Sequence, residues 1–69
     1  MNLIINDEAK SFSNEALTVS ELLKLEEIER PYTVSVQLND EFVAHENYAT
    51  QRLKEGDRVN FLYFMGGGA

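Results

Sequence analysis

The N-terminal segment alternates large apolar residues with other residues at every second position, which is the period expected of a β-strand. One side of this strand would carry Met1, Leu3 and Ile5. Asn-Asp-Glu at residues 6–8 then predicts a tight hairpin turn, because asparagine and aspartate tolerate the left-handed backbone conformation that such a turn needs. A second strand over residues 9–13 would follow, and its single large apolar residue, Phe12, indicates an edge position.

The hydrophobic period changes at residue 18. Thr18 and Glu21 have the spacing of a capping box, in which each side chain bonds the backbone of the other at the start of a helix. One face of the predicted helix would carry Val19, Leu22 and Leu23, with Leu25 at its margin. Ile28 would point to the opposite side of a continued helix, so we expect the helix to end near Glu27, ahead of Pro31.

Alternation returns after the proline. One face of the predicted strand carries Tyr32, Val34, Val36 and Leu38, and the other carries Thr33, Ser35 and Gln37. Asn39 and Asp40 then predict a second hairpin turn, and a short strand over residues 41–44 would follow it. This part of the chain is therefore predicted to form a second antiparallel hairpin.

The C-terminal third begins with a polar connection over residues 45–53, which Tyr48 and Leu53 would anchor. A tight turn at residues 54–57 leads into a last strand over residues 58–64. The order strand, strand, helix, strand, strand, strand closes most naturally as a mixed sheet, because a crossover through one helix is right-handed. We therefore predict an α+β protein of the β-grasp type.

In that arrangement a mixed sheet of four to five strands carries one main helix on one face, and the first and last strands lie side by side at its centre. The β-grasp domain would span residues 1–64, and residues 65–69 would form a flexible, glycine-rich tail. The last strand would then lead directly from the sheet centre into the tail.

The composition excludes several functions. Twelve acidic and six basic residues give a net charge of −6, which disfavours binding to nucleic acid or to an anionic membrane and favours a basic protein partner. The chain has no cysteine and one histidine, too few for a thiolate or imidazole metal site. The sequence has no signal-peptide pattern and no apolar run of membrane-spanning length, so we expect a cytoplasmic protein without a bound cofactor.

Two features could suggest an enzyme, and both have simpler explanations. An acidic run near the helix end comprises Glu26, Glu27 and Glu29, and such a run is usually a solvated helix face. His45 lies in a predicted loop with Asp40 and Glu46 as its nearest candidate partners, and no serine or cysteine nucleophile stands beside it. We therefore predict no catalytic residue and no metal site.

The last strand is apolar on both faces and runs into three glycines. If Val59, Phe61 and Tyr63 face the helix, Leu62 and Phe64 would point to the opposite face and form an exposed apolar patch with Phe42. The predicted docking residues are Phe42, Leu62, Phe64 and Met65. The glycines, Gly66, Gly67 and Gly68, would let a terminal carboxylate enter a channel too narrow for any Cβ. The alternative is a binding module that uses its sheet face alone and has an inert tail.

Taken together, these segments resemble the ubiquitin-like sulfur carriers of the ThiS/MoaD type, most closely the ThiS branch of bacterial thiamine biosynthesis. The resemblance spans the chain and rests on "LIIND", "TVSELL", "VSVQLNDEFV", Tyr48, "LKEGDRVNFLYF" and the glycine run. It implies a substrate rather than an enzyme. A partner of the ThiF/MoeB type, which resembles the ubiquitin-activating enzymes, would adenylate the C-terminal glycine with ATP, and the product would become a thiocarboxylate that donates sulfur.

The resemblance also implies a sulfur donor or sulfurtransferase and a sulfur-accepting synthase such as thiazole synthase. Related carriers feed homocysteine, methionine, cysteine or molybdopterin synthesis, so the pathway stays open.

Two departures from the family pattern stand out. Both hairpin turns have Asn-Asp where many relatives have Asn-Gly, and Ala69 follows the terminal glycine. By analogy with processed carriers, a metalloprotease would remove Ala69 and leave Gly68 as the thiocarboxylate carrier.

Overall fold

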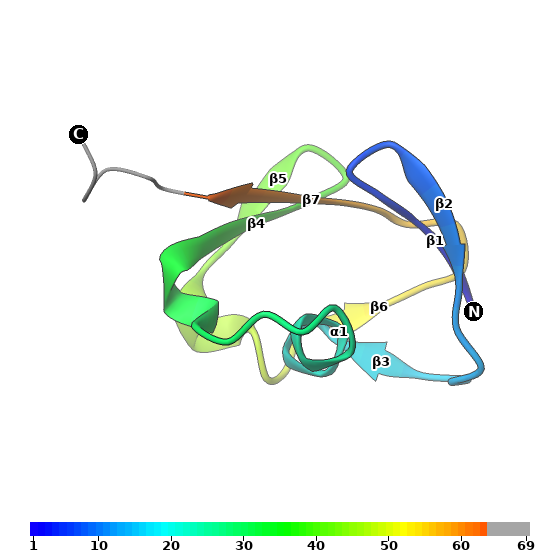
Figure 1. Ribbon diagram of the computed structural model, residues 1–69, viewed down its shortest axis with the longest axis horizontal. Coiled ribbons are helices and arrows are strands. Elements are labelled where there is room, and N and C mark those ends of the chain that lie inside the picture. The colour runs from blue at the N-terminus through cyan, green and yellow to red at the C-terminus, as the bar shows by residue number, and fades with distance from the viewer. Residues whose placement is uncertain (64–69) are drawn as a thin grey trace.

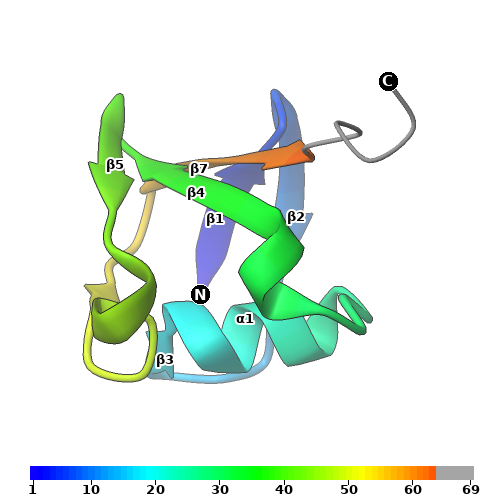
Figure 2. The same ribbon diagram turned by 90° about the vertical axis from the view of Figure 1, so that its left-hand side faces the viewer.

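The computed structural model describes residues 1–63, apart from the side chains of Tyr32 and Tyr63. A five-stranded sheet covers one side of the only α-helix in this part of the chain (Figures 1 and 2). The elements follow the order β1 (Asn2–Ile5), β2 (Glu8–Ser11), β3 (Leu17–Thr18), α1 (Val19–Leu25), β4 (Val34–Leu38), β5 (Glu41–Val43), β6 (Arg52–Leu53) and β7 (Arg58–Tyr63). Two short 3₁₀ turns, Pro31–Thr33 and His45–Asn47, precede β4 and follow β5.

The sheet has the strand order β2-β1-β7-β4-β5, in which β1 and β7 are parallel and the other neighbours are antiparallel. The predicted β-grasp arrangement is thus confirmed, with the first and last strands paired at the sheet centre. A second, two-stranded ladder of β3 and β6 lies beside α1 (Figure 1). This ladder was not predicted, and residues 52–53 of β6 lie in the predicted polar connection.

Both hairpins have two-residue turns. Ile5 lies opposite Glu8 in the first hairpin, and Leu38 lies opposite Glu41 in the second. The turn residues Asn6, Asp7, Asn39 and Asp40 have φ of 48°, 67°, 50° and 71°. These positive values are those of the type I′ turn, which matches the twist of the strands it joins. The Asn-Asp pairs therefore adopt the geometry that Asn-Gly would supply.

Helix α1 begins with the predicted capping box. Thr18 Oγ1 accepts the N–H of Glu21 at 3.2 Å, and Glu21 Oε1 accepts the N–H of Thr18 at 2.9 Å. The helix ends at Leu25, slightly before the predicted end near Glu27, because Glu27 adopts a left-handed φ of 59°. The chain reverses there, so Ile28 packs against the core and donates its N–H to Leu23 O at 2.9 Å.

The core lies between α1 and one face of the sheet. Its buried residues are Leu3, Ile5, Leu17, Val19, Leu22, Leu23, Val34, Val36, Tyr48, Leu53, Val59 and Phe61. Tyr48 and Leu53 anchor the connection as predicted, and the Tyr48 hydroxyl donates to Val34 O at 2.8 Å. Burial raises the pKa of Tyr48. The second strand ends at Ser11 rather than Ser13, and Phe12 packs against the core from the edge of the sheet.

Candidate docking face and tail exit

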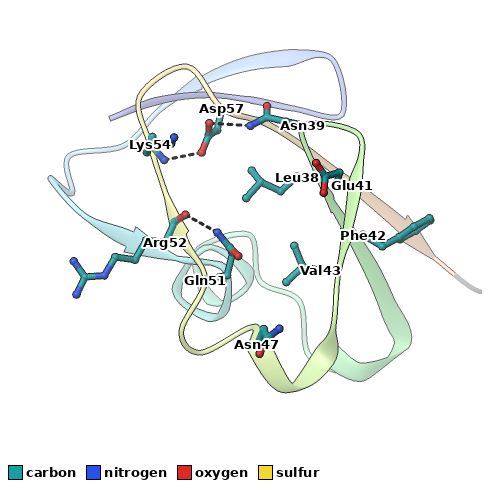
Figure 3. A pocket seen from close by; sticks show the side chains of 10 residues that line it. All are labelled: Leu38, Asn39, Glu41, Phe42, Val43, Asn47, Gln51, Arg52, Lys54 and Asp57. Carbon is teal, nitrogen blue, oxygen red and sulfur yellow. Dashed lines mark hydrogen bonds between the residues drawn. The ribbon is translucent and has the colours of Figure 1, made fainter.

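The face of the sheet opposite α1 carries two large exposed apolar side chains. Leu62 of β7 lies opposite Ser35 of β4, and Phe42 of β5 lies opposite Gln37 of β4, so alternation places all four side chains on this face. Leu62 is 42% exposed and Phe42 is 65% exposed. Figure 3 shows the Phe42 ring pointing away from the body of the protein. We call this surface the open face.

The open face is poor in charge. In the described strands, alternation assigns to it Asn2, Ile4, Ala9, Ser11, Ser35, Gln37, Phe42, Arg58, Asn60 and Leu62. Arg58 is the one ionised residue among them, although 26% of the whole chain is charged. The centres of protein–protein interfaces are depleted in charge in the same way. Two exposed apolar side chains on a face with one ionised strand residue therefore make the open face a candidate protein-docking surface.

Strand β7 connects the open face with the tail, and neighbours on both sides fix its start. β1 pairs with it at Ile4–Arg58 and Ile5–Val59, whereas β4 pairs with it along residues 59–63. Beyond Val59 the described backbone ladder with β1 stops, because β1 turns away into the first hairpin. Only β4 continues beside the end of β7.

The two turn asparagines both bind β7. Asn6 donates its N–H to Val59 O at 3.0 Å, and its Oδ1 accepts the N–H of Phe61 at 2.8 Å. Asn39 donates its N–H to Arg58 O at 2.8 Å, and its Oδ1 accepts the N–H of Arg58 at 3.0 Å. Sequence reasoning missed these bonds. The available signal was that asparagine, unlike glycine, brings an acceptor to the first position of each turn.

Asn39 is also part of a small network that closes the turn before β7. Its Nδ2 donates to Asp57 Oδ1 at 3.1 Å, and the N–H of Lys54 donates to Asp57 Oδ2 at 2.7 Å. Asp57 is the one buried charged residue of the described chain, and these bonds compensate its burial. The same residues border a hollow of about 340 Å³ between β5 and residues 47–57, into which Leu38 and Val43 project (Figure 3).

The remaining predicted site residues lie outside the described residues: Phe64, Met65, Gly66, Gly67, Gly68 and Ala69. The docking residues Phe42 and Leu62 share the open face, as predicted, while their role in docking stays a prediction. The structure thus places two of the four predicted docking residues on one face, with β4 between their strands.

The residues considered for enzymatic chemistry do not form a site. His45 stacks edge-on against Tyr48, with ring centroids 5.1 Å apart. Glu26 is not part of a solvated face, because its carboxylate pairs with Lys10 Nζ at 2.8 Å and its side chain is 16% exposed. This bond raises the pKa of Lys10. Across residues 1–63, no group of three or more histidine or acidic side chains is placed to hold a metal ion.

Comparison with known proteins decides between the families that this geometry allows. Residues 3–68 match the sequence model of the ThiS family. The chain belongs to the ThiS family. ThiS proteins are small sulfur carriers rather than enzymes, and membership implies interaction with ThiF-like enzymes and sulfur-transfer partners in general. A search of curated proteins found no match.

Two solved structures are similar over nearly the whole chain. One is the crystal structure of the thiamine biosynthesis protein ThiS from Geobacter metallireducens, with 40% identity, a TM-score of 0.87, and coverage of 99% of this chain and 100% of that chain. The other is an NMR structure of a thiamine biosynthesis protein from the same organism, with 40% identity, a TM-score of 0.83, and coverage of 100% of this chain and 90% of that chain.

Within residues 1–63, no helix has the length and apolarity needed to span a membrane.

Proposed function

We propose that this ThiS-family protein is the sulfur carrier for the thiazole part of thiamine and that it acts in the cytoplasm. The observation that carries the proposal is the 40% identity to thiamine biosynthesis proteins over the full length of the fold. The position of β7 supports it, since a strand held at the sheet centre leads into a glycine run whose residues offer no side-chain obstruction.

The proposed chemistry takes place at the carboxylate of Gly68. A ThiF-like partner joins this carboxylate to the AMP part of ATP and releases pyrophosphate. A sulfur nucleophile then attacks the acyl carbon, AMP leaves, and one carboxylate oxygen is replaced by sulfur. The carrier needs no catalytic residue for either step, because the partner binds ATP and supplies the reacting groups. A carboxylate alone is a poor acceptor, and adenylation provides the leaving group.

Ala69 must be removed before this chemistry can reach Gly68. We propose that a metalloprotease cleaves the Gly68–Ala69 bond, after which Gly66, Gly67 and Gly68 thread into the active site of the partner. Intact-mass measurement of the protein purified from its native cell tests this step. We expect the mass of residues 1–68, and an active pool that retains alanine would contradict the processing step.

The direct test of the carrier function uses the chain ending at Gly68. This protein is incubated with ATP, sulfide and a ThiF-like enzyme, and its intact mass is followed. We expect the mass to rise by the difference between sulfur and oxygen, and the product then to lose its sulfur to a thiazole synthase. A chain without residues 67–69 should fold and remain unmodified. If no thiocarboxylate forms, the carrier function is wrong.

The enzyme system that accepts the sulfur decides the biosynthetic pathway. Transfer of sulfur to a homocysteine, cysteine or molybdopterin synthesis system, and none to thiazole synthase, would keep the carrier chemistry and replace the thiamine assignment. A protein that keeps all its biological activity without residues 67–69 would instead be a binding module that uses the open face alone.

A further inference from the structure

The first turn of the chain contributes a hydrogen bond that its own geometry does not require. A type I′ turn needs positive φ at both central residues, and glycine would meet that requirement as well as asparagine. Asn6 in addition turns its side-chain oxygen toward β7, where Oδ1 accepts the N–H of Phe61 at 2.8 Å. This bond joins positions 55 residues apart in the sequence. It therefore concerns the placement of β7 rather than the local turn.

The bond lies where β7 loses its second neighbour. The described ladder between β1 and β7 has its last pair at Ile5 and Val59. Phe61 is buried, and a buried backbone N–H without a partner is costly. The oxygen of Asn6 takes the place that a further residue of β1 would have occupied. Phe61 is thus held from both sides, by Asn6 and by its pairing with Val36 of β4.

The bond from Phe61 to Asn6, which we call the clamp, sets how far along β7 the strand is held from both sides, whereas pairing with β4 continues to Tyr63. Gly68 lies seven residues beyond Phe61, so the extended chain reaches about 23–25 Å from the clamp. Without the Asn6 bond, the last residue of β7 held on both sides would be Val59. Asn60 and Phe61 would then be held by β4 alone, and the lost restraint would have to be restored each time the tail enters a partner.

We propose that Asn6 is a positioning residue for activation of the C-terminal carboxylate: its side-chain oxygen fixes the end of β7 and thereby the point and direction from which the tail leaves. The proposal rests on the carrier function proposed above. Docking through the open face does not depend on Asn6, so loss of the clamp should affect the turnover of bound carrier rather than its binding.

Asn39 provides a matched control within the same chain. It occupies the same position of the same turn type, has φ of 50° against 48° for Asn6, and also binds a β7 amide through Oδ1. Its bond is to Arg58, at the start of β7 and away from the tail. Asn39→Gly removes at least as many side-chain bonds as Asn6→Gly, since Asn39 also donates to Asp57. It therefore controls for general loss of stability.

The experiment compares the wild-type chain ending at Gly68 with Asn6→Gly, Asn39→Gly and Asn6→Asp. Amide exchange is measured by NMR, and steady-state adenylation is measured with ATP and a ThiF-like enzyme. For Asn6→Gly we expect amide exchange at least tenfold faster at Phe61 and unchanged at Val36. We expect the kcat of adenylation to be three- to tenfold lower and the KM for the carrier to stay within twofold of wild type. The size of the effect follows because ordering one residue of backbone corresponds to roughly a tenfold change in an equilibrium.

The other two variants test whether the acceptor oxygen is responsible. Asn39→Gly should speed exchange at Arg58 and leave kcat within twofold of wild type. Asn6→Asp keeps an acceptor at the same place and tolerates positive φ, so it should restore both Phe61 protection and kcat. If Asn6→Gly alone does not fold, the comparison is made in an Asp7→Gly background, because Gly-Gly is accepted in this turn type.

The proposal is overturned if Asn6→Gly has wild-type kcat, if Asn39→Gly lowers kcat equally, or if Asn6→Asp fails to rescue kcat. Failure of the proposed function looks different: the wild-type chain itself would not be adenylated, and the role of Asn6 in activation would fall with it. The exchange rate of Phe61 does not depend on any partner and reports on the clamp in either case.

Discussion

Glu27 has a backbone conformation that does not suit its side chain. Five residues other than glycine have positive φ in the described chain, and four of them are the asparagines and aspartates of the hairpin turns. The fifth is Glu27, at 59°, which ends α1. Helices usually have glycine here, because a Cβ makes the left-handed conformation unfavourable. Packing of Ile28 against the core and its bond to Leu23 compensate this strain.

We therefore expect Glu27→Gly to stabilise the protein by about 0.5–1 kcal/mol, because glycine removes the steric cost of the reversal. Removal of a negative charge near the helix C-terminus also favours folding, so Glu27→Gln serves as the control, since it removes the charge and keeps the Cβ. Urea unfolding measures both variants. Equal stabilisation in the two would show that the charge, and not the backbone, is responsible.

Single-residue features were the hardest to predict. Pattern and spacing identified the Thr18–Glu21 capping box, and alternation identified the outward positions of Phe42 and Leu62. The bonds of Asn6 and Asn39 to β7 were missed, because periodicity assigns a residue to a face and gives no information about an acceptor that crosses to a distant strand. The Lys10–Glu26 ion pair was missed for the same reason.

At the scale of elements, the turn at residues 54–57 does more than join β6 to β7. Glu55 Oε1 accepts the N–H of Asn2 at 2.9 Å, and Gly56 donates its N–H to Asn2 O at 2.8 Å. Ile4 donates its N–H to Asp57 O at 3.0 Å. The turn is thus tied to β1, which lies beside β7 in the sheet. Local turn chemistry predicted this turn and could not predict its partner strand.

The bond from Asn2 lowers the pKa of Glu55 below its ordinary value of 4.5. A carboxyl group with a lowered pKa in the folded state stabilises the protein above the unfolded pKa, and this contribution is lost as the pH falls through the folded pKa. We expect Glu55→Gln to flatten the fall in stability on acidification. The measurement is the urea midpoint between about pH 3 and about pH 7. A fall in stability on acidification that is as steep in Glu55→Gln as in the wild type would contradict the prediction.

The elements of the main sheet and the helix followed from the sequence, and the two-residue strands did not. β1, β4 and α1 each show a clear period, β7 is an apolar run after a tight turn, and the order of these elements around one crossover helix led to the correct fold. β3 and β6 have two residues each, which is too few to show a period. Their pairing depends on the path of the chain around α1, and this path is a property of the completed fold.

At the scale of the whole molecule, large apolar side chains are exposed on both sides, and the open face differs by being poor in charge. The open face has Arg58 as its one ionised strand residue, while an exposed leucine, Leu25, lies on the helix side at 47%. Leu62 on the open face has nearly the same exposure, 42%. These two leucines differ in the surface around them and therefore allow a controlled test of where a partner docks.

We expect Leu62→Ser to raise the KM of the ThiF-like enzyme for the carrier about tenfold, which corresponds to the loss of about 1.4 kcal/mol of binding free energy. Leu25→Ser removes a leucine of similar exposure from the other side and should leave KM within twofold. Urea unfolding of both variants controls for stability, since exposed positions usually change it by less than about 0.5 kcal/mol. A KM that rises for Leu25→Ser and not for Leu62→Ser would place the docking surface on the helix side.

The central position of β7 also has a consequence for synthesis. Since β7 separates β1 from β4, the sheet has a gap at its middle until residues 58–63 have left the ribosome. Pairing of Ile5 with Val59 joins positions that are far apart in the sequence, and such contacts form late and slowly. A nascent chain interrupted before β7 cannot complete the sheet and exposes the edges of β1 and β4 to proteases. The five-stranded sheet that carries the open face can therefore form only in chains that have been translated through β7.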